Sequence, residues 1–488
     1  MNIGEKKVMK NLHDVLIIGA GVTGTMIARE LSKYLLDVVI LDKNNDAGDA
    51  TSSANSAIIH SGYDPEPGSL KAKFNVLGNA KYPKLVKELD VPFIQCGSLT
   101  VAIEDEQLIV LKELAERSKL NGVEVKLLDK EEVIKMEPNI TPEIKGALFA
   151  PTAGIIDPFN LVVHAMENAI DNGVTFLRNH EVLGIEKQDN GYLVKTNKED
   201  LYAKVVINAA GVFSDKIATM VEPIDWAITP RKGEYFLLDH YAYGLVNHTI
   251  FPLPSKKGKG VLVSQTTSGN YIVGPSSELA EPDDVSTDGA TLSNIRKSAT
   301  LMVPSIPFNQ TIRVFAGERA TCTRHDFIIE YAKSDKHFIN VAGIESPGLA
   351  SSPAIAEYVV NELVKPLIKL EDNPKFNPCV KPYHRMHYLS EEEQLAVIKS
   401  DPDYGKIICN CEHISLGEIK DALSRSCPPV SIKGVKRRTR SGYGKCQGGF
   451  CQPKVLMLLA EHYHVSPTKI PLAEEGSYII DHEIKEVK

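Results

Sequence analysis

The sequence predicts an α/β fold in which a parallel-sheet domain is interrupted by a second, mainly antiparallel α+β domain. Three apolar, strand-like runs, 15–18, 205–211 and 338–343, end at or just before a glycine. Helical spacing of apolar residues follows the first and the last of them. Strand, glycine and helix in repeated order are typical of a parallel sheet with helices on its faces. Because long inserts separate the units, we expect this domain to be discontinuous.

The inserts carry a different pattern. Within 86–150 and 221–324, short runs such as 234–238 and 260–264 read as strands, bounded by turn-forming residues. Strands of this kind are typical of antiparallel sheets with one buried face. We assign both inserts to one substrate domain. The discontinuous domain then comprises 12–85, 151–220 and 325–368.

The first unit has the residues of a dinucleotide site. Gly19, Gly21 and Gly24 follow the strand at 15–18 and open a helix. The first glycine allows a tight turn, the second lets a pyrophosphate approach the backbone, and the third lets helix and strand pack closely. Asp42 ends the next strand, where a carboxylate can bind the adenosine ribose hydroxyls. This register predicts a Rossmann-like dinucleotide site, but the glycines alone do not distinguish NAD from FAD.

Size and charge restrict the class of protein. At 488 residues the chain exceeds one ordinary core, so two or three domains are expected. The net charge of −8 argues against a nucleic-acid partner. There is no apolar run long enough to span a bilayer, and the polar, charged residues 1–10 do not resemble a secretory signal peptide. We therefore expect a cytoplasmic protein, with any membrane contact made through a partner.

Four of the eight cysteines form two close pairs near the C-terminus, Cys409 with Cys411 and Cys446 with Cys451. In a cytoplasmic protein such pairs more often hold a metal than form disulfides. Four thiolates could hold one zinc ion or a [2Fe–2S] cluster, although zinc sites usually use C-x2-C pairs. The remaining cysteines are interpreted as small buried residues: Cys96, Cys322, Cys379 and Cys427.

A basic stretch precedes the second cysteine pair. Residues 436–440 read Lys-Arg-Arg-Thr-Arg, and Lys445 lies next to Cys446. An oxidised two-iron cluster with four thiolates carries a charge of roughly −2, because two ferric ions meet two sulfides and four thiolates. Nearby cations would ease its burial and reduction. We expect this stretch to supply that charge, although each cation could equally lie on a solvated face.

Four segments resemble the D-amino-acid-oxidase-like superfamily of flavoproteins: 51–62, 154–159, 206–215 and 343–350. In that superfamily the first lies along the pyrophosphate and isoalloxazine, and the last places a helix N-terminus against the flavin pyrimidine ring. The resemblance implies FAD rather than NAD. It places these residues at the cofactor: Gly19, Gly21, Gly24, Asp42, Lys43, Ser52, Ser53, Asn55, Ser56, Val182, Ala210, Gly211, Gly317, Gly343, Gly348, Leu349 and Ala350.

The stretch 436–451 resembles the bacterioferritin-associated-ferredoxin-type, or BFD-like, [2Fe–2S] module, which occurs appended to anaerobic glycerol-3-phosphate dehydrogenases. The resemblance favours a two-iron cluster over zinc. It implies four cluster ligands: Cys409, Cys411, Cys446 and Cys451. We expect the module over 404–465, after a proline-rich linker at 369–403 and before a polar tail at 466–488.

The resemblance leaves two substrates open. Segment 53–62 resembles both glycerol-3-phosphate dehydrogenases and L-2-hydroxyglutarate oxidases, whereas 67–73, 230–235 and 343–348 are closer to the second group. The cluster module favours the first group. We therefore predict oxidation of glycerol 3-phosphate to dihydroxyacetone phosphate. Oxidation of L-2-hydroxyglutarate or another 2-hydroxyacid is the alternative, and a non-catalytic redox-sensing subunit is a third possibility.

Oxidation of an anionic alcohol needs a base and a group that binds the anion. His60 is the candidate base, because imidazole titrates near neutral pH and its segment should face the flavin; it could instead only hydrogen-bond the cofactor. Arg319 matches the family position of a substrate-anion arginine, and Arg231 is a second candidate. His325 and Glu234 are further acid–base candidates.

The two cofactors together imply how electrons leave the substrate. We expect hydride to pass from the alcohol carbon to flavin N5, and electrons to pass singly to the cluster and on to an acceptor. That acceptor could be another flavoprotein subunit, a quinone-linked subunit or a soluble carrier. The sequence thus predicts a small anionic hydroxy substrate, an electron-accepting partner and an oligomeric assembly.

Overall fold

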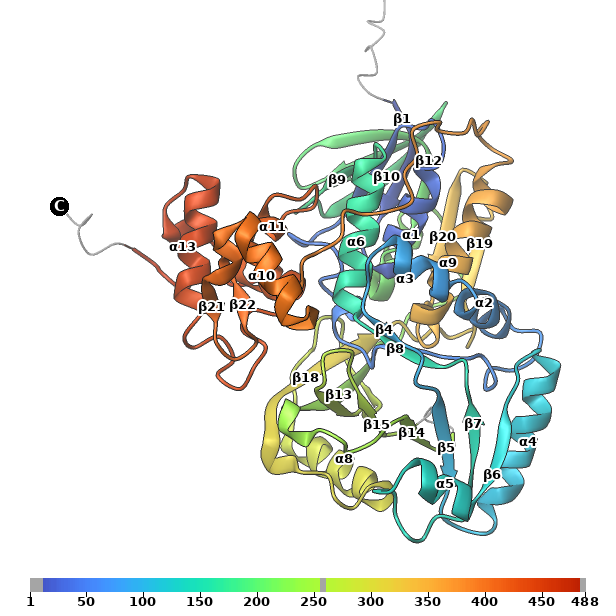
Figure 1. Cartoon of the computed structure of the whole chain (residues 1–488). Coiled ribbons are helices and arrows are strands. Elements are labelled where there is room, and N and C mark those ends of the chain that lie inside the picture. The colour runs from blue at the N-terminus through green and yellow to red at the C-terminus, as the bar shows by residue number, and fades with distance from the viewer. Residues whose placement is uncertain (1–11, 255–259, 483–488) are drawn as a thin grey trace, which may run out of the picture.

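The computed structural model describes residues 12–254 and 260–482, which form two large sheets and a small C-terminal unit (Figure 1). Residues 1–10 and the last part of the predicted tail, 483–488, lie outside the described residues. Within the described ranges no helix is long and apolar enough to cross a membrane.

The first sheet has the order β10-β11-β12-β1-β2-β9, with β20 beside β12 and β19 beside β20. Strand β1 pairs in parallel with both β2 and β12, and β12 pairs in parallel with β20. The strands are β1 (Leu12–Ile18), β2 (Val38–Leu41), β9 (Thr175–Leu177), β10 (Val182–Gln188), β11 (Gly191–Thr196), β12 (Asp200–Asn208), β19 (Ile328–Tyr331) and β20 (Phe338–Ala342). All three predicted strand–glycine units therefore lie in one sheet, which confirms the α/β class.

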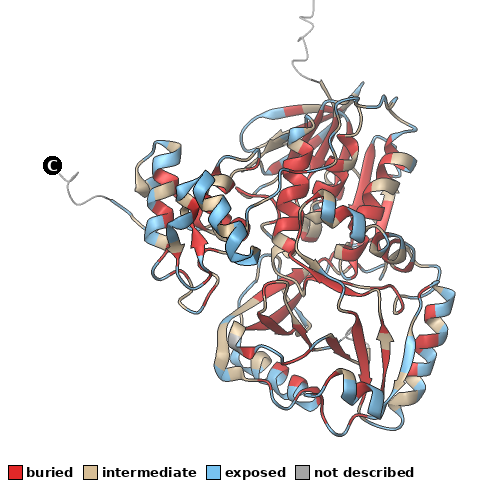
Figure 2. Cartoon of the chain, viewed as in Figure 1, coloured by how far each residue is buried: buried red, intermediate tan, exposed pale blue. Residues whose placement is uncertain are grey.

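Both faces of this sheet are buried (Figure 2). Val15 and Ile17 face a core shared with helices, whereas Leu16 and Ile18 face a second core on the opposite side. Strands that are buried on both faces read as continuous apolar runs, which is why the sequence revealed them. The helices of this domain are α1 (Val22–Leu31), α2 (Leu70–Asn79), α3 (Tyr82–Glu88), α6 (Pro158–Asp171), α7 (Ser214–Thr219) and α9 (Gly348–Tyr358), which a π-helical turn (Val359–Val364) extends.

The second sheet combines strands from both inserts. Its order is β17-β13-β16-β15-β14-β5-β7-β6, with β18 on the other edge of β13, and its pairs are antiparallel except β5–β14. The strands are β5 (Ser98–Ala102), β6 (Lys126–Asp129), β7 (Gly146–Ala150), β13 (Arg231–Leu238), β14 (Thr249–Pro252), β15 (Leu262–Gln265), β16 (Tyr271–Gly274), β17 (Glu278–Leu279) and β18 (Thr311–Arg319). The helices are α4 (Gln107–Leu120), α5 (Lys130–Met136) and α8 (Gly289–Met302).

A small three-stranded sheet joins the two domains. It contains β3 (Ile58–Ile59), β8 (Gly154–Ile156) and β4 (Phe93–Ile94), in the order β3-β8-β4. Strand β3 leads directly to His60, so this sheet places the candidate base between the two large sheets.

The segment expected as a linker, 369–403, lies against the first domain for part of its length. Arg29 donates to the carbonyl of Pro378 at 3.1 Å, and Arg385 contacts Asp90 at 2.8 Å. The ring of Tyr383 stacks on that of His164 in α6, with ring centroids 4.7 Å apart. The segment then forms one helix, α10 (Glu391–Ser400). Cys379, expected to be buried, is exposed within this segment.

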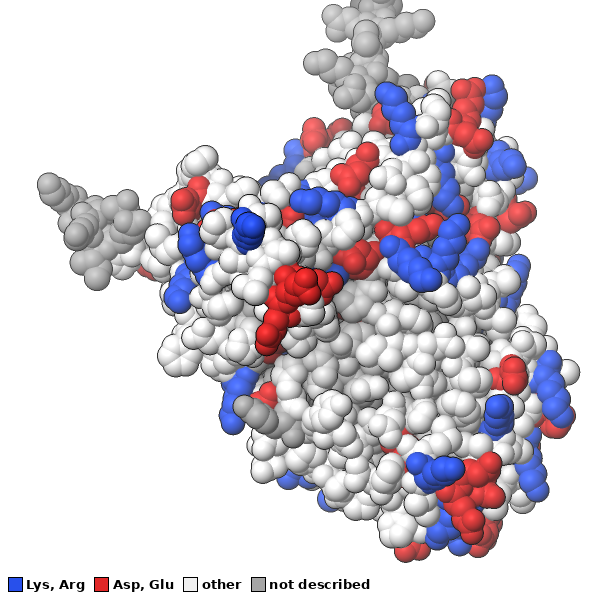
Figure 3. Space-filling model, in the orientation of Figure 1, with Lys and Arg blue, Asp and Glu red and all other residues white. Residues whose placement is uncertain are grey.

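The C-terminal unit contains β21 (Ile407–Cys409), β22 (Ile414–Ser415), α11 (Leu416–Leu423), α12 (Ile432–Thr439) and α13 (Gln452–Tyr463). Cys409 and Cys451 belong to its apolar core. On the face shown in Figure 3, basic and acidic side chains are interspersed, and uncharged surface lies between this unit and the second sheet. No basic stripe typical of nucleic-acid binding is visible on that face.

Candidate functional site

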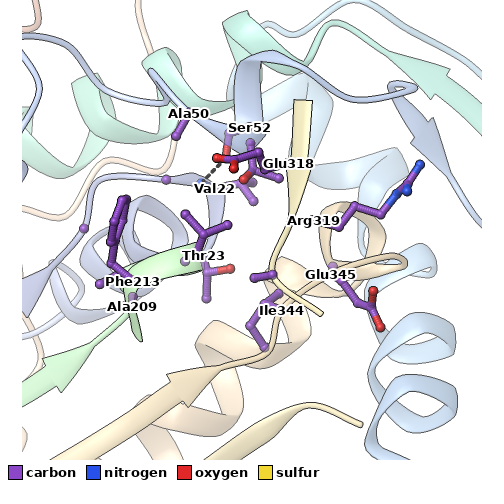
Figure 4. Close-up of a pocket in the computed structure, with 18 of the residues that line it drawn as sticks. Val22, Thr23, Ala50, Ser52, Ala209, Phe213, Glu318, Arg319, Ile344 and Glu345 are labelled. Carbon is purple, nitrogen blue, oxygen red and sulfur yellow. Dashed lines mark hydrogen bonds between the residues drawn. The ribbon is translucent and has the colours of Figure 1, made fainter. Parts of the chain in front are cut away.

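A cavity of about 430 Å³ lies where the two large sheets meet, at the ends of β1, β2 and β12 (Figure 4). Most of the residues predicted at the cofactor line it: Gly19, Gly21, Asp42, Lys43, Ser52, Asn55, Ser56, Val182, Ala210, Gly211, Gly317, Gly348 and Leu349. Four predicted residues are not among the described lining residues: Gly24, Ser53, Gly343 and Ala350. Its lining combines the glycine turn with apolar side chains and a smaller number of hydroxyl and charged groups, a composition typical of a cofactor site.

Two positions of the turn after β1, Gly19 and Gly24, leave no room for a side chain. Gly19 has φ +103°, and a Cβ there would lie 2.5 Å from the carbonyl oxygen of Ala209. A Cβ at Gly24 would lie 1.9 Å from the carbonyl oxygen of Gly19, so helix α1 touches the turn backbone to backbone. At Gly21 a Cβ would approach the Ser52 hydroxyl to 3.4 Å. This close packing leaves the N-terminus of α1 open towards the cavity, where it suits a pyrophosphate.

Residues 42–53, here called the cavity loop, lie across this turn. The carboxylate of Asp42 accepts hydrogen bonds from the backbone N–H groups of Ala20 at 2.7 Å and Asn44 at 2.8 Å. The N–H of Val22 donates to the Ser52 hydroxyl at 2.9 Å, as the dashed line in Figure 4 shows. Burial raises the pKa of Asp42 to about 6. The position of this acid beside the glycines fits a ribose-binding role in the FAD site.

The affinity for FAD is therefore expected to depend on pH. Ribose hydroxyls donate to a carboxylate, so FAD favours the ionised form of Asp42. Below the pKa of about 6 the free protein must lose a proton to bind. The dissociation constant should then rise by up to about tenfold for each pH unit below 6 and level off above it. Fluorescence titration from pH 5 to 8 measures this, and an Asp42→Asn variant should lack the dependence.

The other end of the cavity holds candidate catalytic groups. His60, Tyr235, Arg319 and Glu345 all line it. The backbone carbonyl of His60 accepts hydrogen bonds from two asparagine amides of α2, at 2.6 and 3.1 Å, and its ring lies 5.7 Å from that of Phe251. These contacts fix the His60 backbone. The structure thus brings the candidate base and the candidate anion-binding arginine into the same cavity.

Arg231 has a different environment. It stands opposite Arg319 in the β13–β18 register, yet its guanidinium donates to the hydroxyl and the carbonyl of Ser277, at 3.0 and 2.8 Å. Arg231 is not among the described lining residues of the cavity, and neither are the further acid–base candidates Glu234 and His325. Glu234 is buried, and burial raises its pKa.

Sequence reasoning did not single out two lining residues, Tyr235 and Glu345. The Tyr235 hydroxyl lies 3.1 Å from that of Ser56, which joins the substrate sheet to the segment after the cavity loop. Glu345 is paired with Lys71 at 2.7 Å and accepts from Thr321 at 2.7 Å. Both residues lie within segments that resemble the family, 230–235 and 343–350. Their contacts are with residues distant in sequence, so no local pattern indicates their roles.

The four clustered cysteines come together as two pairs. The Cys411 and Cys446 sulfurs are 3.5 Å apart, and Cys409 and Cys451 lie together in the apolar core of the unit. Among the described residues, no three His, Cys, Asp or Glu side chains form a group arranged to hold a metal ion. Two thiol pairs suit a two-iron cluster, in which each iron takes two thiolates.

The basic stretch is not simply a source of charge for the cluster. Arg438 is fully buried in an ion pair with Asp46, and Arg437 is paired with Asp49, both in the cavity loop. Arg440 is paired with Glu412 at 3.0 Å. Lys436 lies over the ring of Tyr443, and burial lowers its pKa to about 8. The expectation therefore needs correction, because the two central arginines join the module to the first domain.

Comparisons with known proteins agree with this geometry. A glycerol 3-phosphate dehydrogenase from Caloramator mitchellensis is 47% identical over 96% of this chain and 98% of that protein. An L-2-hydroxyglutarate dehydrogenase from Escherichia coli K12 is 32% identical over 55% of this chain and 65% of that protein. The FAD-bound L-α-glycerophosphate oxidase from Mycoplasma pneumoniae superposes with a TM-score of 0.73 and 34% identity, covering 77% of this chain and all of that one.

Two family matches divide the chain as the structure does. Residues 407–461 match the BFD-like [2Fe–2S] binding domain, and the four paired cysteines lie within this range. Residues 14–362 match the FAD dependent oxidoreductase family, DAO, and include every residue at the cavity named above. The chain therefore belongs to the DAO family of FAD-dependent oxidoreductases and carries a C-terminal BFD-like [2Fe–2S] domain.

Proposed function

We propose that this protein oxidises glycerol 3-phosphate to dihydroxyacetone phosphate and delivers the electrons through its [2Fe–2S] domain to an acceptor. The observation that carries the proposal is one continuous cavity holding a dinucleotide site at one end and His60 with Arg319 at the other. The Caloramator relative, a glycerol 3-phosphate dehydrogenase, matches this chain through the cluster domain as well as the FAD domain. That match favours the phosphate ester over other anionic alcohols.

The residues of the cavity have separate roles in this proposal. Arg319 binds the substrate anion, because its guanidinium offers several donors from the end of β18. His60 accepts the hydroxyl proton while the carbon loses its hydrogen as hydride. FAD, when bound, supplies the two-electron acceptor for that hydride.

A substrate panel tests the proposal. Purified protein holding both cofactors is mixed anaerobically with glycerol 3-phosphate, L-2-hydroxyglutarate and other hydroxyacids, and loss of flavin absorbance is followed. Bleaching by glycerol 3-phosphate alone supports the proposal. Bleaching by L-2-hydroxyglutarate alone refutes it in favour of the second candidate, which the E. coli relative and segment 67–73 favour. No bleaching by any alcohol would indicate the redox-sensing subunit.

Substitution of Arg319 tests how the anion is bound. Arg319→Met should lower kcat/KM for glycerol 3-phosphate about 100-fold, because the substrate charge loses its partner in a desolvated site. FAD affinity should stay unchanged. Arg231→Met is the matched control, since its guanidinium is bound to Ser277 outside the described lining, and it should change kcat/KM by less than about threefold. Equal losses in the two variants would contradict the assignment.

The proposal also covers the domain division of the protein, its location and its partners. We propose the domain division given above from the sequence, with the FAD domain at 12–85, 151–220 and 325–368 and the substrate domain at 86–150 and 221–324. The protein acts in the cytoplasm within an oligomer, and a partner subunit or soluble carrier accepts its electrons. Cys411 is exposed and Cys446 is half-buried, which supports an approach of such a partner from the side of these two thiols.

A further inference from the structure

The cavity loop, residues 42–53, is held from two sides. On its inner side it contributes much of the cofactor cavity and is bonded to the glycine turn through Asp42, Ser52 and the N–H of Gly48, which donates to the Ala20 carbonyl at 2.9 Å. On its outer side it carries Asp46, which is 1% exposed, and Asp49. Neither carboxylate is among the described lining residues of the cavity, and both need partners, because a buried unpaired charge is strongly unfavourable.

The partners come from helix α12 of the cluster domain. Arg438 binds Asp46 with both terminal nitrogens, at 2.7 and 2.8 Å, and its remaining donors bond the carbonyls of Cys427 and Gly434. Arg437 and Lys433 are paired with Asp49, and Arg437 also donates to the Ser53 hydroxyl at 3.3 Å. The planar, two-donor geometry of Arg438 fixes the loop in direction as well as distance.

Helix α12 lies in the chain between the two cysteine pairs. Its core neighbours include Cys409 and Cys451, so its position depends on the closure of the cluster domain. A domain as small as 407–461 has a limited apolar core, and in such domains metal binding contributes to folding. Loading of the cluster therefore also sets the position of Arg437 and Arg438.

We propose that α12 contributes to FAD binding. Arg437 and Arg438 position the cavity loop, so that FAD affinity and cluster retention are coupled. Coupling of this kind is reciprocal, so bound FAD must also raise the affinity of the domain for its iron. The inference concerns cofactor binding and holds whichever alcohol is oxidised.

Flavin titration of the full-length, flavin-stripped protein tests the proposal. Arg438→Met should raise the FAD dissociation constant at least about tenfold while the chain keeps its iron. The matched control is Arg425→Met, which breaks another ion pair between the cluster domain and α6, with Glu167, but touches no loop residue. The control should change FAD affinity by less than about threefold.

A second variant separates positioning from the effect of an unpaired charge. In Asp46→Asn/Arg438→Met neither charge remains, so the pair is lost without leaving a buried carboxylate alone. Weak FAD binding in this double variant supports the proposal. Recovery of wild-type affinity would overturn it, because the single variant would then act only through the uncompensated Asp46.

Iron removal gives a readout independent of Arg438. Chelation of iron from the full chain should weaken FAD binding of the wild type about as much as Arg438→Met does, and should add less than about twofold in that variant. At equilibrium, FAD should raise the chelator concentration that removes half of the iron in the wild type and not in the variant. FAD affinity that stays the same after iron removal would overturn the coupling.

Discussion

Replacing Gly24 by alanine is expected to abolish tight FAD binding, raising the dissociation constant at least about 100-fold. A Cβ at this position would stand 1.9 Å from the carbonyl oxygen of Gly19, so the helix and the turn must separate by more than an ångström, on the order of a methyl radius. Helix propensity alone would predict the opposite, since alanine is favoured over glycine inside a helix by about 1 kcal/mol.

The control for this substitution is Gly289→Ala. Gly289 begins α8 in the substrate domain, and a Cβ there meets no atom within 4 Å. Flavin content after gel filtration and fluorescence titration should be unchanged in this variant. If Gly24→Ala retained FAD as firmly as the control, the backbone contact between α1 and the glycine turn would not be what shapes the pyrophosphate site.

His60→Gln is expected to slow flavin reduction by glycerol 3-phosphate about 10³-fold, because glutamine keeps a hydrogen-bonding side chain but cannot take up the hydroxyl proton. Single-turnover absorbance measurements isolate this step from release and acceptor chemistry. FAD affinity should change little, since the His60 backbone stays fixed by the amides of Asn75 and Asn79. The variant should also lose the acid limb of the pH–rate profile.

His325→Gln supplies the comparison. His325 is exposed, has a left-handed backbone with φ +58°, and is not among the described residues of the cavity. Its replacement should leave flavin reduction within about twofold of the wild type. A loss confined to KM in His60→Gln, with an unchanged pH profile, would show that the imidazole only binds substrate or cofactor.

Much of the fold could be predicted because its signals are local. Val15 to Ile18 form a continuous apolar run because both faces of β1 are buried, and Gly19 and Gly24 are required by contacts within one strand–turn–helix unit. The four cysteines were informative for a similar reason, since pairs close in sequence already place two thiols together. Such features depend on a few neighbouring residues and can be read without the tertiary structure.

Features that depend on distant partners could not be read in this way. Arg231 and Arg319 stand opposite each other on adjacent strands, yet only Arg319 lines the described cavity, and sequence gave no sign of the contact between Arg231 and Ser277. Arg438 and Asp46 are far apart in the chain. The sequence therefore revealed the positive charge of the basic stretch but not the carboxylate with which it pairs. Cys379 was expected to be buried on composition alone and is exposed.

The packing of 369–403 has a consequence for turnover. Because Pro378, Tyr383 and Arg385 contact the first domain, the cluster domain is not attached through a flexible linker. The distance that an electron must cross between the two cofactors is fixed when the chain folds, and no movement of the cluster domain is required to shorten it. Raising the viscosity of the solvent with sucrose should therefore slow the binding of substrate and acceptor without slowing electron transfer between the two cofactors.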